Sequence, residues 1–237
     1  MDITRAFTFV FEDDDWVGKV VMIIVWAFIS IIPLVGLVGW AALAGYVVQM
    51  LRNMRRGDEN PLPTWDNLGA KITDGANVLI AAFVYNLGNM LVACGLVLLM
   101  PAMGMMDNGD AAFASTASLV ISCCLGIVLL IYNLVVWPLL AVGTIHYSQT
   151  GQIGSFFQLG HIYGTINRNA SATGQWIIFG IFAGFILGLI NAIPCIGWLV
   201  GLGLTVPING HLLGQYALRL QDKPKGKPKA RPVEVRR

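Results

Sequence analysis

The sequence predicts an all-α fold, a polytopic membrane helix bundle with six transmembrane helices. Composition and hydropathy lead to this prediction. Hydrophobic residues make up 56% of the 237 residues and charged residues only 12%, about half of the charged share found in soluble domains. The mean hydropathy is +0.69. Because so few charges cannot coat a soluble domain of this size, we expect lipid to surround most of the chain.

Six apolar segments have about the length that a helix needs to cross a bilayer, which is roughly 17 to 25 residues. The second segment is short, whereas the third and fourth are long enough that we expect them to tilt, kink or leave the membrane. Pro138 lies inside the fourth segment and predicts a kink there. The six segments are residues 16–32, 37–51, 76–103, 117–145, 175–193 and 198–218.

Two amphipathic helices are predicted at the inner membrane interface. Apolar residues recur at helical spacing from Ile3 to Phe11 and again from Ile153 to His161, which is typical of helices that lie flat on a membrane. Trp16 and Trp176 then mark the points where the chain is expected to enter the lipid, because indole rings favour the interface.

A weak internal repeat relates the two ends of the chain. Each amphipathic helix is followed by a hairpin that turns at an Ile-Pro-x-x-Gly motif, at residues 32–36 and at residues 193–197. Both hairpins leave from the inside, so the repeat is parallel, unlike the inverted repeats of many secondary transporters. We expect one domain over residues 1–220, with repeat halves at about 1–103 and 117–220.

The basic residues predict that both ends of the chain lie in the cytosol. With the N-terminus inside, six crossings place all 15 Lys and Arg residues on the inner side, in agreement with the positive-inside rule. Residues 221–237 are expected to form a disordered basic tail that either fixes the orientation or contacts anionic headgroups. The predicted location is therefore the cytoplasmic membrane. The expected partners are the lipid bilayer and other membrane proteins or a second copy, and no nucleic acid.

The polar run RNMRRGDENPLPTWDNLG, residues 52–69, interrupts the apolar chain. Arg52, Arg55 and Arg56 end the second apolar segment, where positive charge complements the helix dipole. Gly57 is suited to cap that helix, and Trp65 is expected to dip into the interface. We interpret the run as an anchor at the inner face, with a docking surface for another protein as the alternative.

Several runs together resemble a family of prokaryotic membrane proteins known as domain of unknown function 4013. They are AFTFVFEDDDW, the first Ile-Pro-x-x-Gly turn, RRGDENPLPTWDNLG, GSFFQLGHIYGTINRN and HLLGQYAL. The likeness spans about residues 1–220. This resemblance implies a multi-pass membrane protein, and it carries over no catalytic or binding residue.

His211 is the candidate ligand-binding residue inside the membrane, because polar side chains at that depth are energetically costly. Pro207 breaks the helical hydrogen bonding close to Asn209 and His211, and Asn191 adds a further amide. Three interpretations remain open: interhelical hydrogen bonds, a niche for a small solute or lipid, or ligation of haem or chlorophyll by His211. Other helices contribute Asn86, Asn89 and Asn133.

Two ridges of small residues predict close helix packing. Gly180, Gly184 and Gly188 form one ridge in the fifth segment, and Gly197 and Gly201 begin another in the sixth. Such ridges let helix backbones approach closely. We therefore expect the fifth helix to pack on the sixth, with self-association as the alternative.

The acidic run before the first apolar segment and the cysteines are predicted to have structural roles. The acidic run from Glu12 to Asp15 is interpreted as capping by Asp14 or Asp15, with a divalent-cation site as the alternative. The cysteines are expected to be small buried hydrophobes without a metal site, because they form no CxxC pair. They are Cys94, Cys123, Cys124 and Cys195.

No familiar enzyme motif occurs in the chain, such as GxxxxGK[ST], HExxH or GxSxG. The sequence therefore predicts a protein that is not an enzyme, most simply a scaffold or accessory subunit that packs against other membrane proteins. A carrier of a small solute or lipid, and a haem- or chlorophyll-binding subunit, are the alternatives. Cofactors, partner identity, oligomeric state and pathway are not predicted.

Overall fold

The computed structural model describes residues 1–105, 111–194 and 196–221, and the regular structure within these ranges is entirely helical. This confirms the predicted all-α class. The elements are α1 (Ile3–Thr8), the 3₁₀ helix η1 (Phe9–Glu12), α2 (Trp16–Ile29), α3 (Gly36–Arg56), α4 (Leu68–Tyr85), α5 (Leu87–Met105), α6 (Ala111–Thr150), the 3₁₀ helix η2 (Ile153–Phe157), α7 (Leu159–Arg168), α8 (Ala170–Asn191) and α9 (Ile196–Gln221).

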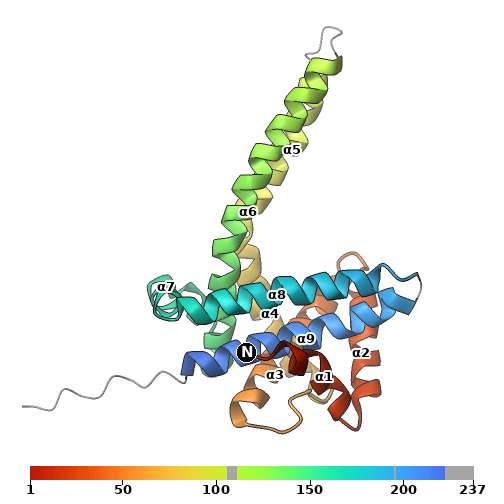
Figure 1. The fold of residues 1–237 in the computed structure, drawn as a ribbon, viewed down its shortest axis with the longest axis vertical. Coiled ribbons are helices and arrows are strands. Elements are labelled where there is room, and N and C mark those ends of the chain that lie inside the picture. The colour runs from red at the N-terminus through yellow and green to blue at the C-terminus, as the bar shows by residue number, and fades with distance from the viewer. Residues whose placement is uncertain (106–110, 195, 222–237) are drawn as a thin grey trace, which may run out of the picture.

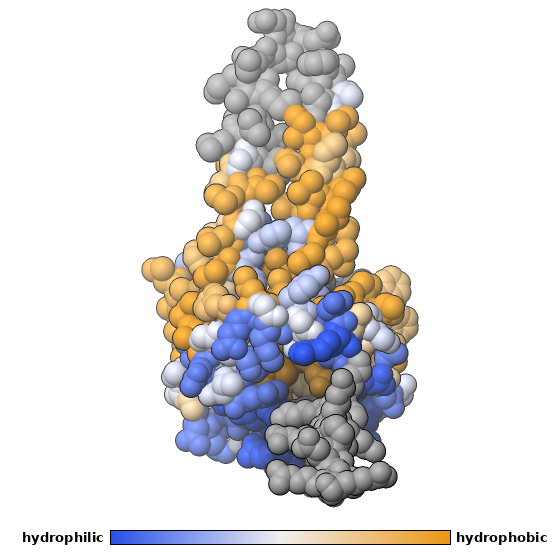
Figure 2. Space-filling view, turned by 90° about the vertical axis from the view of Figure 1, so that its left-hand side faces the viewer, coloured by the Kyte–Doolittle hydropathy of each residue, from blue (hydrophilic) through white to orange (hydrophobic). Residues whose placement is uncertain are grey.

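A long hairpin of α5 and α6 projects from a body that the other helices form (Figure 1). The 40 residues of α6 correspond to about 60 Å at 1.5 Å per residue, and the helix continues through Pro138. The α8–α9 pair lies in the body and runs across the direction of the α5–α6 pair (Figure 1). On the face that Figure 2 shows, apolar residues predominate on the coloured part of the projecting hairpin, whereas hydrophilic residues gather toward the opposite end of the molecule.

The length and hydropathy of the helices suit a membrane protein. Among the described residues, Leu119–Thr150 and Ala170–Asn191 are each long and apolar enough to cross a bilayer. Leu68–Tyr85 and Leu87–Gly95 pass the same test together as a pair bent by 49°. The helix α2 has only 14 residues, about 21 Å. By these criteria the described helices provide two or three crossings, so six crossings go beyond what length and hydropathy establish.

The predicted third segment is divided at Asn86. The Asn86 amide nitrogen Nδ2 donates to the carbonyl of Ala82 at 2.7 Å, and the Tyr132 hydroxyl donates to the carbonyl of Tyr85, also at 2.7 Å. Carbonyls at a helix break need such partners, above all in lipid, where water does not supply them. The side chains of Asn86, between α4 and α5, and of Tyr132 in α6 thus stabilise the bend.

The core of the body forms where α3 packs against α4 and α9. The backbones of α3 and α4 approach so closely that a Cβ atom added at Gly45 would overlap the carbonyl of Lys71, and one added at Gly75 would overlap the carbonyl of Ala41. Large side chains of α3, including Tyr46 and Met50, are completely buried on this helix. These contacts make α3 the central helix of the body.

The two hairpins that carry Ile-Pro-x-x-Gly turns meet near their tips. The rings of Phe28 and Trp198 make an edge-to-face contact with centroids 5.4 Å apart. The first turn exposes apolar side chains, with Leu34 87% exposed. An exposed hairpin tip without a charged residue is suited to lipid or to a membrane interface rather than to open water.

Each predicted amphipathic helix forms two short helices instead of one. The first consists of α1 and η1, and the second of η2 and α7. Their apolar residues contact the body of the protein: Phe9, Val10, Phe156 and Ile162 are all buried. Protein therefore covers much of the first apolar face, whereas Ile153, Phe157 and Leu159 of the second are exposed.

Candidate functional site

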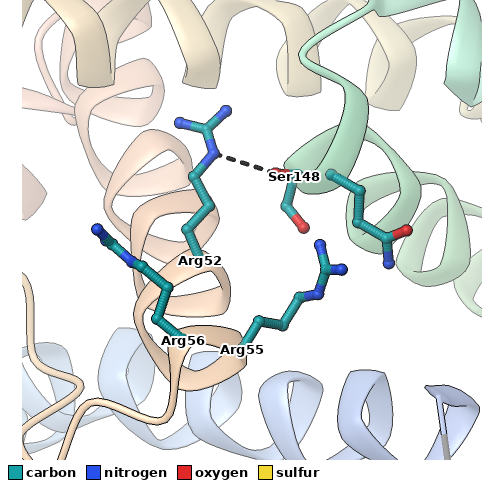
Figure 3. A pocket seen from close by; sticks show the side chains of 5 residues that line it. Arg52, Arg55, Arg56 and Ser148 are labelled. Atoms are coloured by element: carbon teal, nitrogen blue, oxygen red, sulfur yellow. Dashed lines mark hydrogen bonds between the residues drawn. The ribbon is translucent and has the colours of Figure 1, made fainter.

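The three arginines at the end of α3 line a pocket of about 440 Å³ (Figure 3). The other lining residues are Ser148 and Gln149, close to the C-terminal end of α6. The pocket therefore lies where the polar end of α3 meets the end of an apolar helix. All five lining residues are polar, and none of them is acidic: Arg52, Arg55, Arg56, Ser148 and Gln149.

Arg52 is held in place by partners on two other helices. Its Nη1 and Nη2 donate to the carboxylate of Asp74 in α4 at 2.5 and 3.1 Å, and its Nε donates to the carbonyl of Ser148 in α6 at 3.2 Å. The Tyr147 hydroxyl donates to Asp74 at 2.8 Å, and Asn77 donates to that hydroxyl at 2.8 Å. This network joins α3, α4 and α6 and fixes the direction of the Arg52 guanidinium.

The partners of Arg56 are residues that lie close to it in the sequence. Its Nη2 donates to Oδ1 of Asn53 at 2.6 Å, and its Nε lies 3.8 Å from the Asp58 carboxylate in an exposed ion pair. Gly57 adopts the left-handed conformation, with φ of 80°, and its backbone N–H bonds to the carbonyls of Asn53 and Met54. The predicted glycine cap of this helix is confirmed.

Trp65 is partly buried and packs against the body of the protein. Its ring stacks on Tyr46 with centroids 4.9 Å apart and on Trp26 at 6.2 Å. Its indole Nε1 donates to the carbonyl of Lys19 at 3.1 Å. Trp65 therefore ties the polar run to α2 and α3, because the loop is long enough to fold back onto them.

The acidic run before α2 acts mainly through Asp13. The carboxylate of Asp13 lies 2.6 Å from Nζ of Lys19, and their side chains are only 5% and 13% exposed. Asp13 also accepts a bond from the backbone N–H of Asp15 at 2.9 Å. Asp15 occupies the N-cap position of α2 without a side-chain capping bond, so the cap expected of it is not formed, and Asp13 instead pairs with Lys19 in the first turn of α2.

His211 contributes to the attachment of the N-terminal segment. Its buried ring stacks on Phe9 with centroids 4.1 Å apart. Its Nδ1 lies 3.1 Å from the amide nitrogen of Gln215, and that amide donates to the carbonyl of Asp2 at 2.8 Å. These contacts fit a core histidine that fastens α1 and η1 to α9.

The structure does not bring the other two candidate ligand residues to His211. Asn209 is exposed, and its amide donates within α9 to the carbonyl of Thr205 at 2.8 Å. Asn191 lies at the end of α8 beside Gly201, about 12 Å along α9 from Asn209 at 1.5 Å per residue. The niche predicted for a carrier is therefore not assembled from these three side chains.

Interhelical hydrogen bonds between amides do occur in the projecting hairpin. Asn89 and Asn133 exchange bonds of 3.0 and 3.1 Å between α5 and α6, and Asn89 also donates to Asn86 at 2.7 Å. The prediction of such bonds is confirmed for these residues.

The two glycine ridges differ in what they contact. A Cβ atom added at Gly197 or Gly201 of α9 would overlap atoms of Ile190 or Asn191, so the α9 ridge packs on the end of α8. Nothing lies within 4 Å of a Cβ atom added at any glycine of the α8 ridge. The helix α8 does pack on α9, as expected, and its residues Ala183 and Leu187 are buried. The glycine ridge of α8 is not part of this contact and lies on an open face of the helix. Its members are Gly180, Gly184 and Gly188.

The expectation of buried cysteines is wrong for the described residues. Cys94, Cys123 and Cys124 are free and exposed on the α5–α6 hairpin, as expected for apolar side chains that face lipid rather than a protein core. Cys195 lies outside the described residues. Within the ranges described, no three His, Cys, Asp or Glu residues are grouped so that they could hold a metal ion.

The family described as "Protein of unknown function (DUF4013)" matches residues 28–203, about three quarters of the chain. The chain belongs to this family. The DUF4013 match includes both Ile-Pro-x-x-Gly turns, the arginine pocket and the open ridge of α8. It leaves out the acidic run and the region of His211, so it is narrower than the resemblance over residues 1–220. No curated protein and no solved structure matches the chain.

Proposed function

We propose that this DUF4013 protein is a multi-pass protein of the cytoplasmic membrane that acts as a scaffold or accessory subunit. In this role it catalyses no reaction and packs sideways against a transmembrane helix of another membrane protein. The observation that carries the proposal is the open face of α8. The helix is 22 residues long and has a sequence suited to a membrane.

The open face of α8 combines bulky apolar side chains with an accessible backbone. Ile181 and Phe185 are exposed beside the ridge, and no described residue packs against the ridge from Gly180 to Gly188. In lipid, helices associate through close van der Waals packing, and small residues spaced by four permit it. A partner helix would cover the ridge and contact Ile181 and Phe185 beside it.

Six crossings with both ends in the cytosol belong to the same proposal. They require the α8–α9 pair to turn from the crosswise arrangement of Figure 1 into the direction of the α5–α6 pair. Asp2 and Gln215 exchange two hydrogen bonds, of 2.6 and 2.8 Å, which supports an even number of crossings because it holds the two ends of the body together. Between Trp176 and Ile190, α8 has no polar face of the kind that an interfacial helix needs. For the short helix α2, the turn after Ile29 would complete the path across the bilayer.

Photo-crosslinking in native membranes tests the lateral contact. We expect a photoreactive amino acid at Phe185 to give a discrete adduct of higher mass, because the partner helix lies against it. Phe83 on α4 is the control position, since it is similarly exposed, at 56% against 63% for Phe185, and lies on another helix. An adduct with a second copy would identify self-association as the form that the contact takes.

A matched pair of glycine substitutions completes this test. Gly184→Leu places a side chain on the ridge and should abolish the Phe185 adduct. Gly126→Leu alters a glycine of α6 that also has open space around it and should leave the adduct unchanged. The scaffold proposal is contradicted if Phe185 gives no adduct, if Phe83 gives the same adduct, or if the adduct persists in Gly184→Leu.

A further inference from the structure

We propose that the arginine pocket between α3 and α6 binds the phosphate group of an anionic ligand at the cytosolic side of the membrane. The pocket combines three guanidinium groups with a hydroxyl and an amide, and no lining residue is acidic. Arginine binds phosphate well, because its planar fork can donate two parallel hydrogen bonds to the phosphate oxygens.

Arg52 is already oriented before a ligand binds. Its bonds to Asp74 and to the Ser148 carbonyl use three of the five N–H donors of a guanidinium, so two remain for a ligand. A side chain that is fixed in advance loses less conformational entropy on binding. Asp74 lies on another helix and is absent from the lining, so it can orient Arg52 without occupying the pocket.

The charges around the pocket favour an anion. The Asp74 carboxylate pairs with Arg52 from outside the lining, and the Asp58 pair with Arg56 is exposed and 3.8 Å long. An exposed pair of this kind contributes little. The C-terminal ends of α3 and α6 each add up to about half a negative charge, but the Gly57 cap and the Arg52–Ser148 bond satisfy some of their carbonyls. The lining side chains themselves carry only positive charge.

The position of the pocket leaves two possible sources of the phosphate group, a lipid headgroup and a soluble phosphate. Ser148 and Gln149 are close to the end of the apolar segment Leu119–Thr150, where lipid headgroups would lie if this segment crosses the membrane. Arg55, Arg56 and Gln149 are exposed, so a soluble phosphate could reach the same donors. The chemistry shared by both sources is a phosphate group with net negative charge.

Thermal unfolding of the purified full chain in a neutral detergent tests the proposal and separates the two sources. The first arm adds phosphatidylglycerol to the micelles, with phosphatidylcholine as the zwitterionic comparison. The second arm adds inorganic phosphate, with chloride at equal ionic strength as the comparison. We expect a higher Tm in at least one arm, because a ligand that binds only the folded state stabilises it.

Charge-changing variants show whether the pocket is responsible. Arg55→Gln should weaken binding roughly tenfold, as expected for the loss of one charge-assisted contact. Gln149→Glu adds an anion to the lining and should abolish binding, and both positions are exposed, so the fold should tolerate the changes. Arg5→Gln is the control, since it removes one exposed charge from a residue outside the pocket.

Each outcome has a defined meaning. A shift with phosphatidylglycerol alone supports a headgroup site, and a shift with inorganic phosphate supports a site that also accepts soluble phosphates. The inference is overturned if neither arm raises the Tm. It is also overturned if Arg55→Gln and Gln149→Glu respond like the wild type, or if Arg5→Gln loses the shift to the same extent, which would indicate non-specific attraction.

Discussion

Gly75→Ala is expected to destabilise the protein, whereas the same substitution at Gly69 is not. In an ordinary helix position, Gly→Ala stabilises by up to about 1 kcal/mol. At Gly75 the new methyl group would overlap the backbone carbonyl of Ala41, and a backbone atom cannot move aside without shifting the whole of α3. We expect a loss of about 3 kcal/mol, at the upper end of the usual range for overpacking.

Gly69 is the matched control for this prediction. It lies in the same helix, α4, and nothing is within 4 Å of a Cβ atom added there. The measurement is the free energy of unfolding of both variants in the same detergent. A Gly75→Ala variant as stable as Gly69→Ala would show that α3 and α4 are not packed as closely as described.

Asp13→Asn is expected to have the second large effect on stability. The substitution leaves the ammonium group of Lys19 in a site where both side chains are almost completely buried. Removing one partner of a buried ion pair typically costs about 3 to 5 kcal/mol. The carbonyl of Leu62, 3.3 Å from the same nitrogen, retains one weak bond, so we expect a loss of about 3 kcal/mol.

The neighbouring residue Asp14 serves as the control for Asp13. It belongs to the same acidic run but is exposed, so Asp14→Asn should change the free energy of unfolding by less than about 0.5 kcal/mol. Replacing Lys19 with methionine in the Asp13→Asn background should restore part of the stability, because the unpaired charge is then removed. Equal effects of the two aspartate substitutions would count against the buried ion pair.

Local features of this chain could be predicted from the sequence. The helical segments follow from apolar runs that proline, glycine and polar residues interrupt. Gly57 could be predicted as a cap because the cap and the last turn of α3 are adjacent in the chain. The Asn89–Asn133 bonds could be expected because asparagines on apolar helices must find partners, although the pairing itself was not specified.

Features that depend on distant partners could not be predicted in the same way. Trp65 suits a membrane interface by composition, and only the folded loop shows that Tyr46 and Trp26 cover its ring. Residue types alone do not reveal that Arg52 pairs with Asp74, 22 positions away, rather than with the nearby acids of the polar run. This pairing defines the pocket, so the pocket could not be predicted either.

The spacing of the glycines also does not predict which helix packs against the face that they form. The ridge on α8 has the regular spacing of a packing surface, yet the buried residues Ala183 and Leu187 lie on a different face of the helix. Gly45 and Gly75 form no conspicuous pattern, yet they mark the closest approach between α3 and α4. Spacing identifies which residues share a face, whereas the chain connections and the remaining side chains decide what covers that face.

Cysteine accessibility tests the central claim most directly, namely that this protein crosses the membrane with its arginine pocket on the cytosolic side. Single cysteines would replace Asp58, Asn108 or Leu34 in a chain whose four native cysteines are changed to alanine. With an impermeant maleimide added to intact cells, the account predicts labelling at positions 108 and 34. Position 58 should be labelled only after permeabilisation. Labelling of positions 58 and 108 from the same side would contradict the account, and labelling of position 34 only after permeabilisation would contradict six crossings.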